Sequence, residues 1–522
     1  MPIMNKDVVI AGGGLAGLGL AWQMINQKPE LDIAVVERAK FPIHNTTPKV
    51  GESTVEIAAR YFVDTLNLGD HFSNQHLQKF GLRCFFGSPQ SDFSQYDELG
   101  ASDRFPVPTY QLERGTLENF LVEELRNRGV SIDDGSAIQQ VNAEDSEKRL
   151  TFARECGESF EYKSRWLVDC AGRFGLLKNS LDLGSASGHK GNALWFRVDR
   201  TIKIDDWTNN DTWHDRVALK GRRWLSTNHL MGPGYWVWII PLASGATSIG
   251  IVMDDEAWDS ADLTDYPKTL AWLEVMHPQL AESLSGAEVM DFVALEDYSY
   301  SAKRIISAKG WALSGEAGVF ADPFYSPGSD FIAMANDIIS HLVIKDSNDL
   351  PIQQDARIFD AFYKGFFENT VSLYRHEYGG WGDRVMMSGK LTWDYCFYWG
   401  VLALLYYRGA MADASLLRSV NSYLMSALSL NARVQEAFRE RAKSRLVLPA
   451  EGMFIDQYGI PVLHELINQL EDESIPLSDA LDRSLNLMSG VAPSIIGLVS
   501  GSGSAAVKSG QTELLGELRQ VA

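Results

Sequence analysis

A glycine-rich turn between a strand pattern and a helix pattern constrains this chain more than any other feature. The apolar run Val8 to Ala11 predicts a buried strand, and "GGGLAG" at residues 12–17 follows it and opens a helical pattern. The next apolar run ends at Glu37. Such glycines let a pyrophosphate approach the N-terminus of the helix, and a carboxylate after the second strand can accept ribose hydroxyls. A tight turn without a ligand would explain the glycines but not Glu37. The predicted dinucleotide site consists of Gly12, Gly14, Leu15, Ala16, Gly17, Glu37 and Arg38.

Two later motifs favour a flavin over a nicotinamide. The segments "VDCAGRFG" (168–175) and "LSGEAGVFADPFYSPG" (313–328) resemble the later motifs of FAD-dependent oxygenases of the hydroxybenzoate hydroxylase type. In that family an acidic residue of the second segment contacts the ribityl chain, and Glu316 occupies this position where Asp is usual. The resemblance covers about the first two-thirds of the chain and implies FAD as the cofactor.

Two further motifs resemble those of the flavin-dependent halogenases. "KVGEST" (49–54) and "WVWIIP" (236–241) follow the glycine turn in that family's order. The family signature WxWxIP is matched by Trp236 and Trp238, with Pro241 at its end. In the family the two indoles flank the flavin and keep organic substrate away from it. A plain hydrophobic core is the ordinary setting of tryptophan, but it explains neither this spacing nor the proline.

The resemblance also implies a mechanism. Reduced FAD, supplied by a separate flavin reductase, reacts with O₂ and oxidises chloride or bromide to hypohalous acid, which then reaches a lysine. The matching lysine should follow the helix after KVGEST, and Lys79 in "LQKFGLRCFFG" fits this place. A desolvated ammonium can hold and polarise hypohalous acid, and a neutral amine can attack it. Most lysines at the start of a strand are simply exposed, but the motif context favours a catalytic Lys79.

The same resemblance assigns further residues to the flavin site. Residues 38–50 would form the strap that links flavin occupancy to the halogenation site. The remaining cofactor-binding residues are predicted to be Val50, Gly51, Glu52, Ser53, Arg114, Asp169, Gly172, Glu316, Asp322 and Gly328.

The substrate prediction depends on Tyr325. Tryptophan halogenases carry a second catalytic glutamate at this position, whereas halogenases of phenols and pyrroles lack it and usually carry an aromatic residue. Such rings are already electron-rich and need less help at the ring carbon. Tyr325 therefore favours a small phenol- or pyrrole-like substrate, either free or bound to a carrier protein.

Pro327 departs from the family at the halide site. In the family, backbone N–H groups of the two residues after the motif serine help to bind halide, and here these residues are Pro327 and Gly328. Proline has no N–H, although Gly328 and Ser329 keep theirs. The departure keeps open a flavin-dependent aromatic monooxygenase or oxidase that does not use halide. A catalytically silent, partner-binding flavoprotein is a third reading, and the complete nucleotide site argues against it. The predicted halide or substrate residues are Tyr325, Ser326, Pro327, Gly328 and Ser329.

These motifs and the element pattern predict an α/β (α+β) fold. A Rossmann-like FAD-binding domain is expected to interleave with a β-rich substrate domain over residues 1–345, followed by a mainly helical region over 346–522. A helix capped near Ser53 or Thr54 is expected after KVGEST. The Gly/Ser-rich stretch 489–510 is expected to be a loose segment.

Composition excludes some classes of partner. The formal charge of −21 argues against nucleic acid and against an anionic membrane surface. The apolar stretch 395–407 is too short to span a bilayer. The four cysteines are scattered without a CxxC pair, so we expect neither a disulfide framework nor a metal site. Without a signal-peptide pattern before the first strand, a cytoplasmic location is expected.

Overall fold

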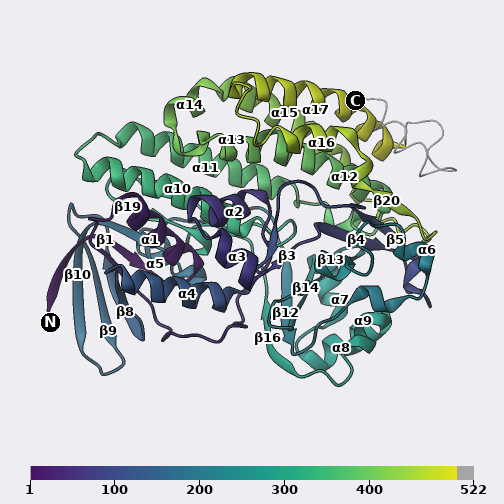
Figure 1. Cartoon of the computed structure of the whole chain (residues 1–522), viewed down its shortest axis with the longest axis horizontal. Coiled ribbons are helices and arrows are strands. Elements are labelled where there is room, and N and C mark those ends of the chain that lie inside the picture. Colours follow the sequence, from purple (N-terminus) through teal and green to yellow (C-terminus); the bar gives the residue numbers. More distant parts are fainter. Residues whose placement is uncertain (1, 502–522) are drawn as a thin grey trace.

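Two large sheets lie side by side beneath a layer of helices in the computed structural model, which describes residues 2–501 (Figure 1). The first sheet carries the N-terminal strand and is mostly parallel along its main path. Its strands in spatial order are β18 (Ile306–Ser307), β19 (Trp311–Leu313), β10 (Ser159–Asp169), β1 (Ile3–Ala11), β2 (Ile33–Val36) and β7 (Ser131–Asp133), with β8 (Ser136–Asn142) and β9 (Lys148–Arg154) attached through β10.

The register of this sheet gathers three sequence motifs at one edge. Ala11 at the end of β1 pairs with Val36 on one side and with Asp169 on the other. Because the carboxyl ends of parallel strands meet at the same edge, the glycine turn, Glu37 and the loop after Asp169 lie next to one another. Helix α1 (Leu15–Gln27) leads away from this edge and contacts both α4 (Arg114–Asn127) and α10 (Gly328–Ser347). The predicted Rossmann-like arrangement is therefore confirmed.

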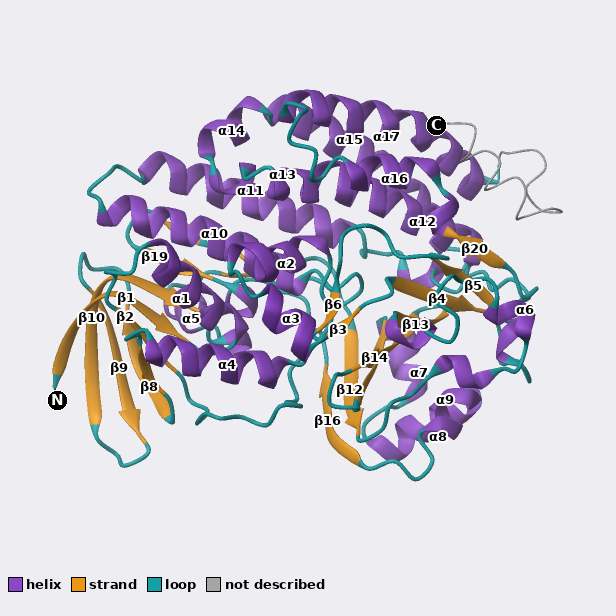
Figure 2. Cartoon of the chain, in the orientation of Figure 1, coloured by secondary structure: helices purple, strands orange, loops and turns teal. Residues whose placement is uncertain are grey.

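The second sheet contains the WVWIIP segment in its interior. Strand β14, which ends with that segment, pairs antiparallel with both of its neighbours. The strands in spatial order are β16 (Val289–Leu295), β12 (Asn192–Val198), β15 (Thr247–Met253), β14 (Tyr235–Pro241), β13 (Thr227–Gly232), β4 (Leu82–Phe86), β5 (Asp97–Gly100) and β20 (Phe454–Asp456). Helices α6 (Asp211–His214), α7 (Asp255–Ala261), α8 (Tyr266–Met276) and α9 (Pro278–Ser283) lie beside it in Figure 2.

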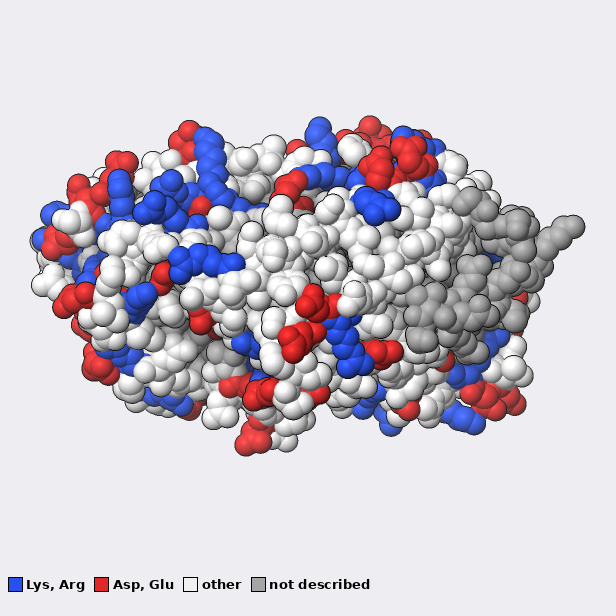
Figure 3. Space-filling model, turned by 90° about the horizontal axis from the view of Figure 1, so that it is seen from above, with Lys and Arg blue, Asp and Glu red and all other residues white. Residues whose placement is uncertain are grey.

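The helical layer spans both sheets (Figure 2). Its core is continuous with that of the first sheet, because buried residues of α10 and of the later helices belong to one hydrophobic cluster with β1. After α10 the layer consists of α11 (Gln353–Ser372), α12 (Arg384–Phe397), a π-helical turn (Tyr398–Ala403), α13 (Leu404–Tyr407), α14 (Ala414–Ser419), α15 (Asn421–Ala442), α16 (Pro461–Asn468) and α17 (Leu477–Ser500). The face above this layer mixes acidic and basic side chains around a largely uncharged middle (Figure 3).

Two local expectations from the sequence are wrong. The start of the stretch 489–510 is not loose, because α17 continues to Ser500; its apolar Val491, Ile495 and Val499 recur at helical spacing and are buried. The rest of that stretch lies outside the described residues. Helix α2 (Glu56–Arg60) begins after Val55, so neither Ser53 nor Thr54 caps it. No helix among the described residues has the length and apolar character needed to cross a membrane.

Candidate active site

The glycine turn leaves room for a phosphate group. Gly12 has φ +109°, and a Cβ there would lie 2.3 Å from the backbone oxygen of Cys170, so only glycine fits. A Cβ on Gly14 would meet nothing within 4 Å, and no side chain caps the helix that starts after it. The free N–H groups and the dipole of α1 therefore face open space that suits an anion.

Glu37 lies directly beside this turn. Its Oε2 accepts a hydrogen bond from the Gly13 N–H at 2.6 Å, and its Oε1 accepts one from the Ala39 N–H at 2.7 Å. The two bonds fix the carboxylate at the end of β2 while leaving acceptor capacity for ribose hydroxyls. Leu15 and Ala16 are buried in the first turn of α1, and Arg38 is exposed. The turn and Glu37 together fit the adenosine end of FAD.

Asp169 serves its own loop. It is fully buried, and its oxygens accept from the backbone N–H groups of Ala171 at 3.0 Å and Leu177 at 2.7 Å. Burial raises the pKa of this carboxyl to about 6. Gly172 in the same loop has φ +62°. These contacts shape the loop that packs against Gly12, so the carboxylate of Asp169 orders the site from behind.

A cavity of about 900 Å³ extends over the region predicted to hold the flavin. It is bounded by the strap end, by the second motif and by the start of α10, and Gly315 of that motif packs against Ala16 of α1. The predicted cofactor residues that line it are Val50, Gly51, Glu52, Ser53, Arg114, Glu316, Asp322 and Gly328. The turn and the cavity adjoin, and together they leave room for a dinucleotide such as FAD.

The strap end is held by buried charged groups. The Arg114 guanidinium donates to the backbone oxygen of Val50 at 2.6 Å, and Arg197 donates to that of Lys49 at 2.7 Å. Arg197 also donates to the Glu52 carboxylate at 2.8 Å. Burial raises the pKa of Glu52, although Arg197 opposes the rise. These contacts tie the end of the strap to α4 and β12.

The two indoles of WVWIIP line the same cavity. Trp236 donates through its ring N–H to the Tyr378 hydroxyl at 3.1 Å, and Trp238 donates to the Ser248 hydroxyl at 3.2 Å. A Cβ on Gly250 would come within 2.1 Å of the Trp238 ring, so the neighbouring strand has made room for this indole. Pro241 ends the strand and does not belong to the described lining. The pair therefore forms a wall of the cavity with both polar atoms satisfied.

Asp322 and His229 show what the motifs alone did not reveal. Asp322 is buried, and its Oδ2 accepts from the hydroxyls of Tyr298 and Tyr378 at 2.5 and 2.6 Å and lies 2.8 Å from His189 Nε2. Its carboxylate is therefore bound to protein groups. His229, a cavity residue that sequence analysis missed, has its pKa lowered to about 3 by burial and is a neutral imidazole. Isolated in the sequence at β13, it carried no motif that could have identified it.

Lys79 lies in a second cavity, of about 800 Å³, on the other side of the KVGEST segment. Its ammonium donates to the Ser53 hydroxyl at 2.9 Å and to the Thr54 backbone oxygen at 3.2 Å, and the residue is only 4% exposed. Burial lowers the pKa of Lys79 to about 8, against the opposing effect of nearby Glu56 and Asp330. Ser53 also lines the flavin cavity. The KVGEST segment therefore lies between the two cavities, and its Ser53 contacts both Lys79 and the flavin cavity.

Six aromatic rings contribute to the walls of this second cavity. The rings come from α10's preceding loop and from the helical layer: Tyr325, Phe366, Tyr374, Tyr395, Phe397 and Tyr398. The Tyr325 hydroxyl donates to Asp394 Oδ2 at 2.8 Å, and burial raises the pKa of Tyr325 well above its usual value. The cavity suits a flat aromatic molecule. Sequence analysis missed the carboxylates in it, Glu56, Asp330 and Asp394, because none belongs to a recognised motif.

The loop before α10 forms the boundary between the cavities. Tyr325 and Ser326 have φ values of +67° and +58°, a left-handed conformation that costs energy for residues other than glycine. Pro327 lines both cavities and precedes the first helical residue, with no side chain capping the helix. Gly328 and Ser329 line the flavin cavity, and their N–H groups belong to the uncapped first turn. A small anion is favoured at that turn even without a donor from Pro327.

Comparisons with known proteins point to one group. No family model matches the chain. It is 26% identical over 437 residues to flavin-dependent halogenase chlA of Dictyostelium discoideum, covering 77% of this chain and 70% of that protein. It is 26% identical over 411 residues to 1H-pyrrole-2-carbonyl-(peptidyl-carrier protein) chlorinase of Pseudomonas fluorescens, covering 74% and 84%. The solved structure of halogenase PltM has a TM-score of 0.67 at 16% identity, covering 91% of this chain and 98% of PltM.

Sequence relatives and structures bear on different conclusions. The halogenase names among the sequence relatives support an FAD-dependent halogenase, in agreement with the motif analysis. The solved structures confirm the fold, an FAD-binding α/β unit with a helical region. They confirm the fold alone, because their sequences are too distant to indicate a function. Flavin-dependent brominase Bmp2 is a second such structure, with a TM-score of 0.55 at 20% identity, covering 72% of this chain and 87% of Bmp2.

Proposed function

We propose that the protein is a flavin-dependent halogenase that uses reduced FAD, O₂ and chloride or bromide to halogenate a small electron-rich aromatic ring. The observation that carries this proposal is the position of Lys79, in a cavity lined by aromatic rings that one short segment separates from the predicted flavin cavity. Two cavities with this relation suit a reaction in which the oxidant is made in one place and used in another.

The FAD site is proposed to run from the glycine turn to the start of α10. Gly12, Gly14 and Glu37 would hold the adenosine diphosphate, and the cavity residues described above would hold the isoalloxazine end. When bound and reduced, FAD supplies the oxygen chemistry that converts halide to hypohalous acid. The described residues show one glycine turn of this type, so we propose that a separate flavin reductase supplies the reduced cofactor.

The chain's own residues would then divide the work. Trp236 and Trp238 exclude organic substrate from the flavin cavity with two large rings whose N–H groups are both hydrogen-bonded. Lys79 holds hypohalous acid by donating to its oxygen, which makes the halogen more electrophilic. Because Ser53 and Thr54 accept two of the three ammonium protons, the third is directed into the cavity.

The proposed substrate is a phenol- or pyrrole-like ring. Tyr325 occupies the place of a second catalytic glutamate, and its hydroxyl is already bound to Asp394. The name of the pyrrole chlorinase relative describes a substrate held on a carrier protein, and such a tethered ring is one form of the proposal.

We propose the cytoplasm as the site of action and a division into residues 1–345 and 346–522, with β20 as a strand that the C-terminal part returns to the second sheet.

The competing function is an aromatic monooxygenase on the same scaffold. It is favoured by one observation, the proline at a position where the halide site of the family uses a backbone N–H. A substrate panel separates the two proposals: resorcinols, simple phenols, pyrroles and free tryptophan are incubated with FAD, a reductase and bromide, and products are identified by mass. We expect bromination of the first three classes and poor turnover of tryptophan. Hydroxylated products would favour the monooxygenase, and efficient bromination of tryptophan would contradict the role given to Tyr325.

A further inference from the structure

A carboxylate that no motif identifies lies in the cavity with Lys79. Asp330 is in the first turn of α10, is 1% exposed and lines the aromatic cavity. It stands five residues after Tyr325, which occupies the position of the usual glutamate. The helix therefore brings another carboxylate to a cavity that lacks that glutamate.

Two elements, α2 and the π-helical turn after α12, hold the Asp330 side chain in place. Its Oδ1 accepts from the Ala58 N–H at 2.9 Å, and its Oδ2 accepts from the Tyr398 hydroxyl at 2.8 Å. Tyr398 also accepts a hydrogen bond from the Ile57 N–H at 3.1 Å, and it begins the π-helical turn between α12 and α13. Such turns are uncommon and frequently occur at functional sites. The carboxylate is fixed in direction but keeps free acceptor capacity on both oxygens.

The charged groups around Asp330 leave one carboxyl group that can take up or release a proton. Lys79 is one cation facing two buried carboxyl groups, Glu56 and Asp330. Burial raises the pKa of both carboxyl groups, that of Asp330 to about 8, and the negative charge of Glu56 adds to the rise at Asp330. In the part of the chain that the structure describes, the Lys79 ammonium contacts Ser53 and Thr54 and pairs closely with neither carboxylate.

The other carboxylates of the cavity are less suited to act on a ring. Asp394 is occupied by the Tyr325 hydroxyl, by Gln435 at 2.8 Å and by the Lys390 ammonium at 3.1 Å. Glu56 lines both this cavity and an adjoining one, whereas Asp330 lines this cavity but not the adjoining one. Asp330 lies in the aromatic cavity and already accepts a hydrogen bond from one phenol, Tyr398.

We propose that Asp330 is the base of the halogenation step and accepts the proton of a ring hydroxyl on the substrate. This inference rests on the proposed function and narrows its substrate class to hydroxylated aromatic rings. Removing the hydroxyl proton places phenolate electron density on the ring carbons, which then attack the halogen held beside Lys79.

The step balances as the sum of a ring C–H and hypohalous acid giving a ring C–halogen bond and water. The hydroxyl proton moves to Asp330 as a ring carbon attacks the halogen, and the oxygen–halogen bond breaks with its electron pair staying on oxygen. The resulting hydroxide takes the proton from the halogenated carbon and becomes water. Asp330 returns its proton to the ring oxygen, and the aromatic ring is restored.

The test compares a ring that carries hydroxyl protons with the same ring in which methyl groups replace them. Wild type and Asp330→Asn are given resorcinol and its dimethyl ether with FAD, a reductase and bromide. We expect the substitution to lower kcat for resorcinol by about 100-fold and that for the ether by less than about threefold, because the ether has no hydroxyl proton. A small reporter molecule in solution that reacts with released hypobromous acid should be oxidised at the wild-type rate in the variant.

Two controls separate catalysis from folding. Asp337→Asn removes another carboxylate of α10, one that accepts from Gln23 at 2.6 Å outside the aromatic cavity, and it should leave the ratio of the two rates unchanged. Tyr398→Phe keeps the Asp330 carboxylate but removes one of its two hydrogen bonds, so it should lower the resorcinol rate by less than Asp330→Asn does. Equal losses on both rings in Asp330→Asn would overturn the assignment alone. A wild-type protein that brominates neither ring would overturn it together with the proposed function.

Discussion

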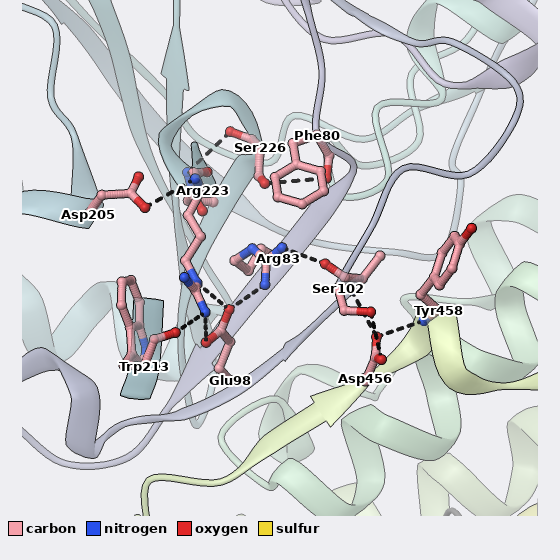
Figure 4. Close-up of polar contacts among 12 residues, drawn as sticks. Phe80, Arg83, Glu98, Ser102, Asp205, Trp213, Arg223, Ser226, Asp456 and Tyr458 are labelled. Carbon is pink, nitrogen blue, oxygen red and sulfur yellow. Dashed lines mark hydrogen bonds and ion pairs between the residues drawn. The ribbon is translucent and has the colours of Figure 1, made fainter. Parts of the chain in front are cut away.

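Lys79 and Arg83 stand four residues apart in the sequence but belong to two different kinds of buried charged cluster. Around Arg83, the side chains of Arg83, Glu98 and Arg223 are fully buried and in direct contact, with Glu98 between the two guanidiniums (Figure 4). Arg223 donates to Glu98 at 2.8 Å and its guanidinium lies 3.7 Å from the Trp213 ring centre. Every member packs against protein.

The cluster around Lys79 is open, because its members line a cavity, whereas the cluster around Arg83 is closed, because its members contact one another directly. Lys79, Glu56 and Asp330 surround a cavity, and the pKa values of Lys79 and Asp330 both lie at about 8. Burial is common to both clusters, so burial alone does not mark a functional charge. The difference is contact: directly paired charges hold β4 and β5 together, whereas charges spaced around a cavity retain a proton that can move.

The largest effect is expected from breaking the closed cluster. Glu98→Gln removes the carboxylate that both guanidiniums contact and leaves two buried cations without it, which should lower the free energy of unfolding by about 3–5 kcal/mol. Denaturant unfolding measures the change. As a control, Glu465→Gln removes the partly exposed pair with Arg483 and should cost less than about 1 kcal/mol. Similar small losses in both variants would show that the closed cluster is not structural.

Breaking the open cluster should affect chemistry in preference to folding. We expect Lys79→Ala to lower the rate of halogenated product formation by about 100- to 1,000-fold, because the donor to hypohalous acid is lost. Flavin reoxidation should continue, with peroxide released in place of product. Thermal unfolding of the variant should stay near that of wild type. A variant that halogenates at the wild-type rate would make Lys79 a structural residue of the cavity wall.

At the nucleotide end, charge rather than packing is expected to decide binding. Gly14→Asp would place a negative side chain beside the diphosphate and should weaken FAD binding by about 100-fold, or about 2.7 kcal/mol. Gly14→Ala is the matched control, because a Cβ at that position meets nothing within 4 Å and the backbone φ of −84° suits alanine. Fluorescence titration gives both affinities. Wild-type affinity in a folded Gly14→Asp protein would place the diphosphate elsewhere.

The smallest effect is expected at the boundary between the cavities. Pro327→Thr restores a backbone N–H at the start of α10, and one hydrogen bond to an anion should lower the half-saturating bromide concentration by about tenfold, or about 1.4 kcal/mol. Product yield against bromide concentration measures it. Because bromide is more easily oxidised than chloride, wild type should use bromide more readily. An unchanged half-saturating concentration would mean that the halide site lies away from residue 327.

The parts that could be predicted from sequence are those built from one continuous segment. The strand, glycine turn and helix of the predicted nucleotide site and the paired indoles belong to short motifs whose local geometry follows from their spacing, whereas Lys79 was assigned by the family resemblance. A helix cap was predicted at Ser53 or Thr54, but the Ser53 hydroxyl binds that of Thr227 and accepts from Lys79, and the Thr54 hydroxyl donates to the backbone oxygen of Tyr110. Their true partners lie on other strands, where no local rule reaches.

Residues that meet only in the folded chain could not be predicted. Asp330 acquires its surroundings from α2 and from the π-helical turn, through Ala58 and Tyr398. The buried position of Glu98 between two arginines likewise depends on β4 and on the segment before β13. In a sequence these residues look like ordinary surface charges, because nothing local records that they become buried.

In the proposed reaction, halide that is oxidised in the flavin cavity becomes bonded to an aromatic ring beside Lys79. The most direct test follows resorcinol in halide-free buffer and with increasing bromide, at a fixed supply of reduced FAD, and records product mass and flavin reoxidation together. We predict a brominated product with the two-isotope pattern of bromine, whose yield rises with bromide and vanishes without halide. A hydroxylated product whose yield is the same at every bromide concentration would contradict the account.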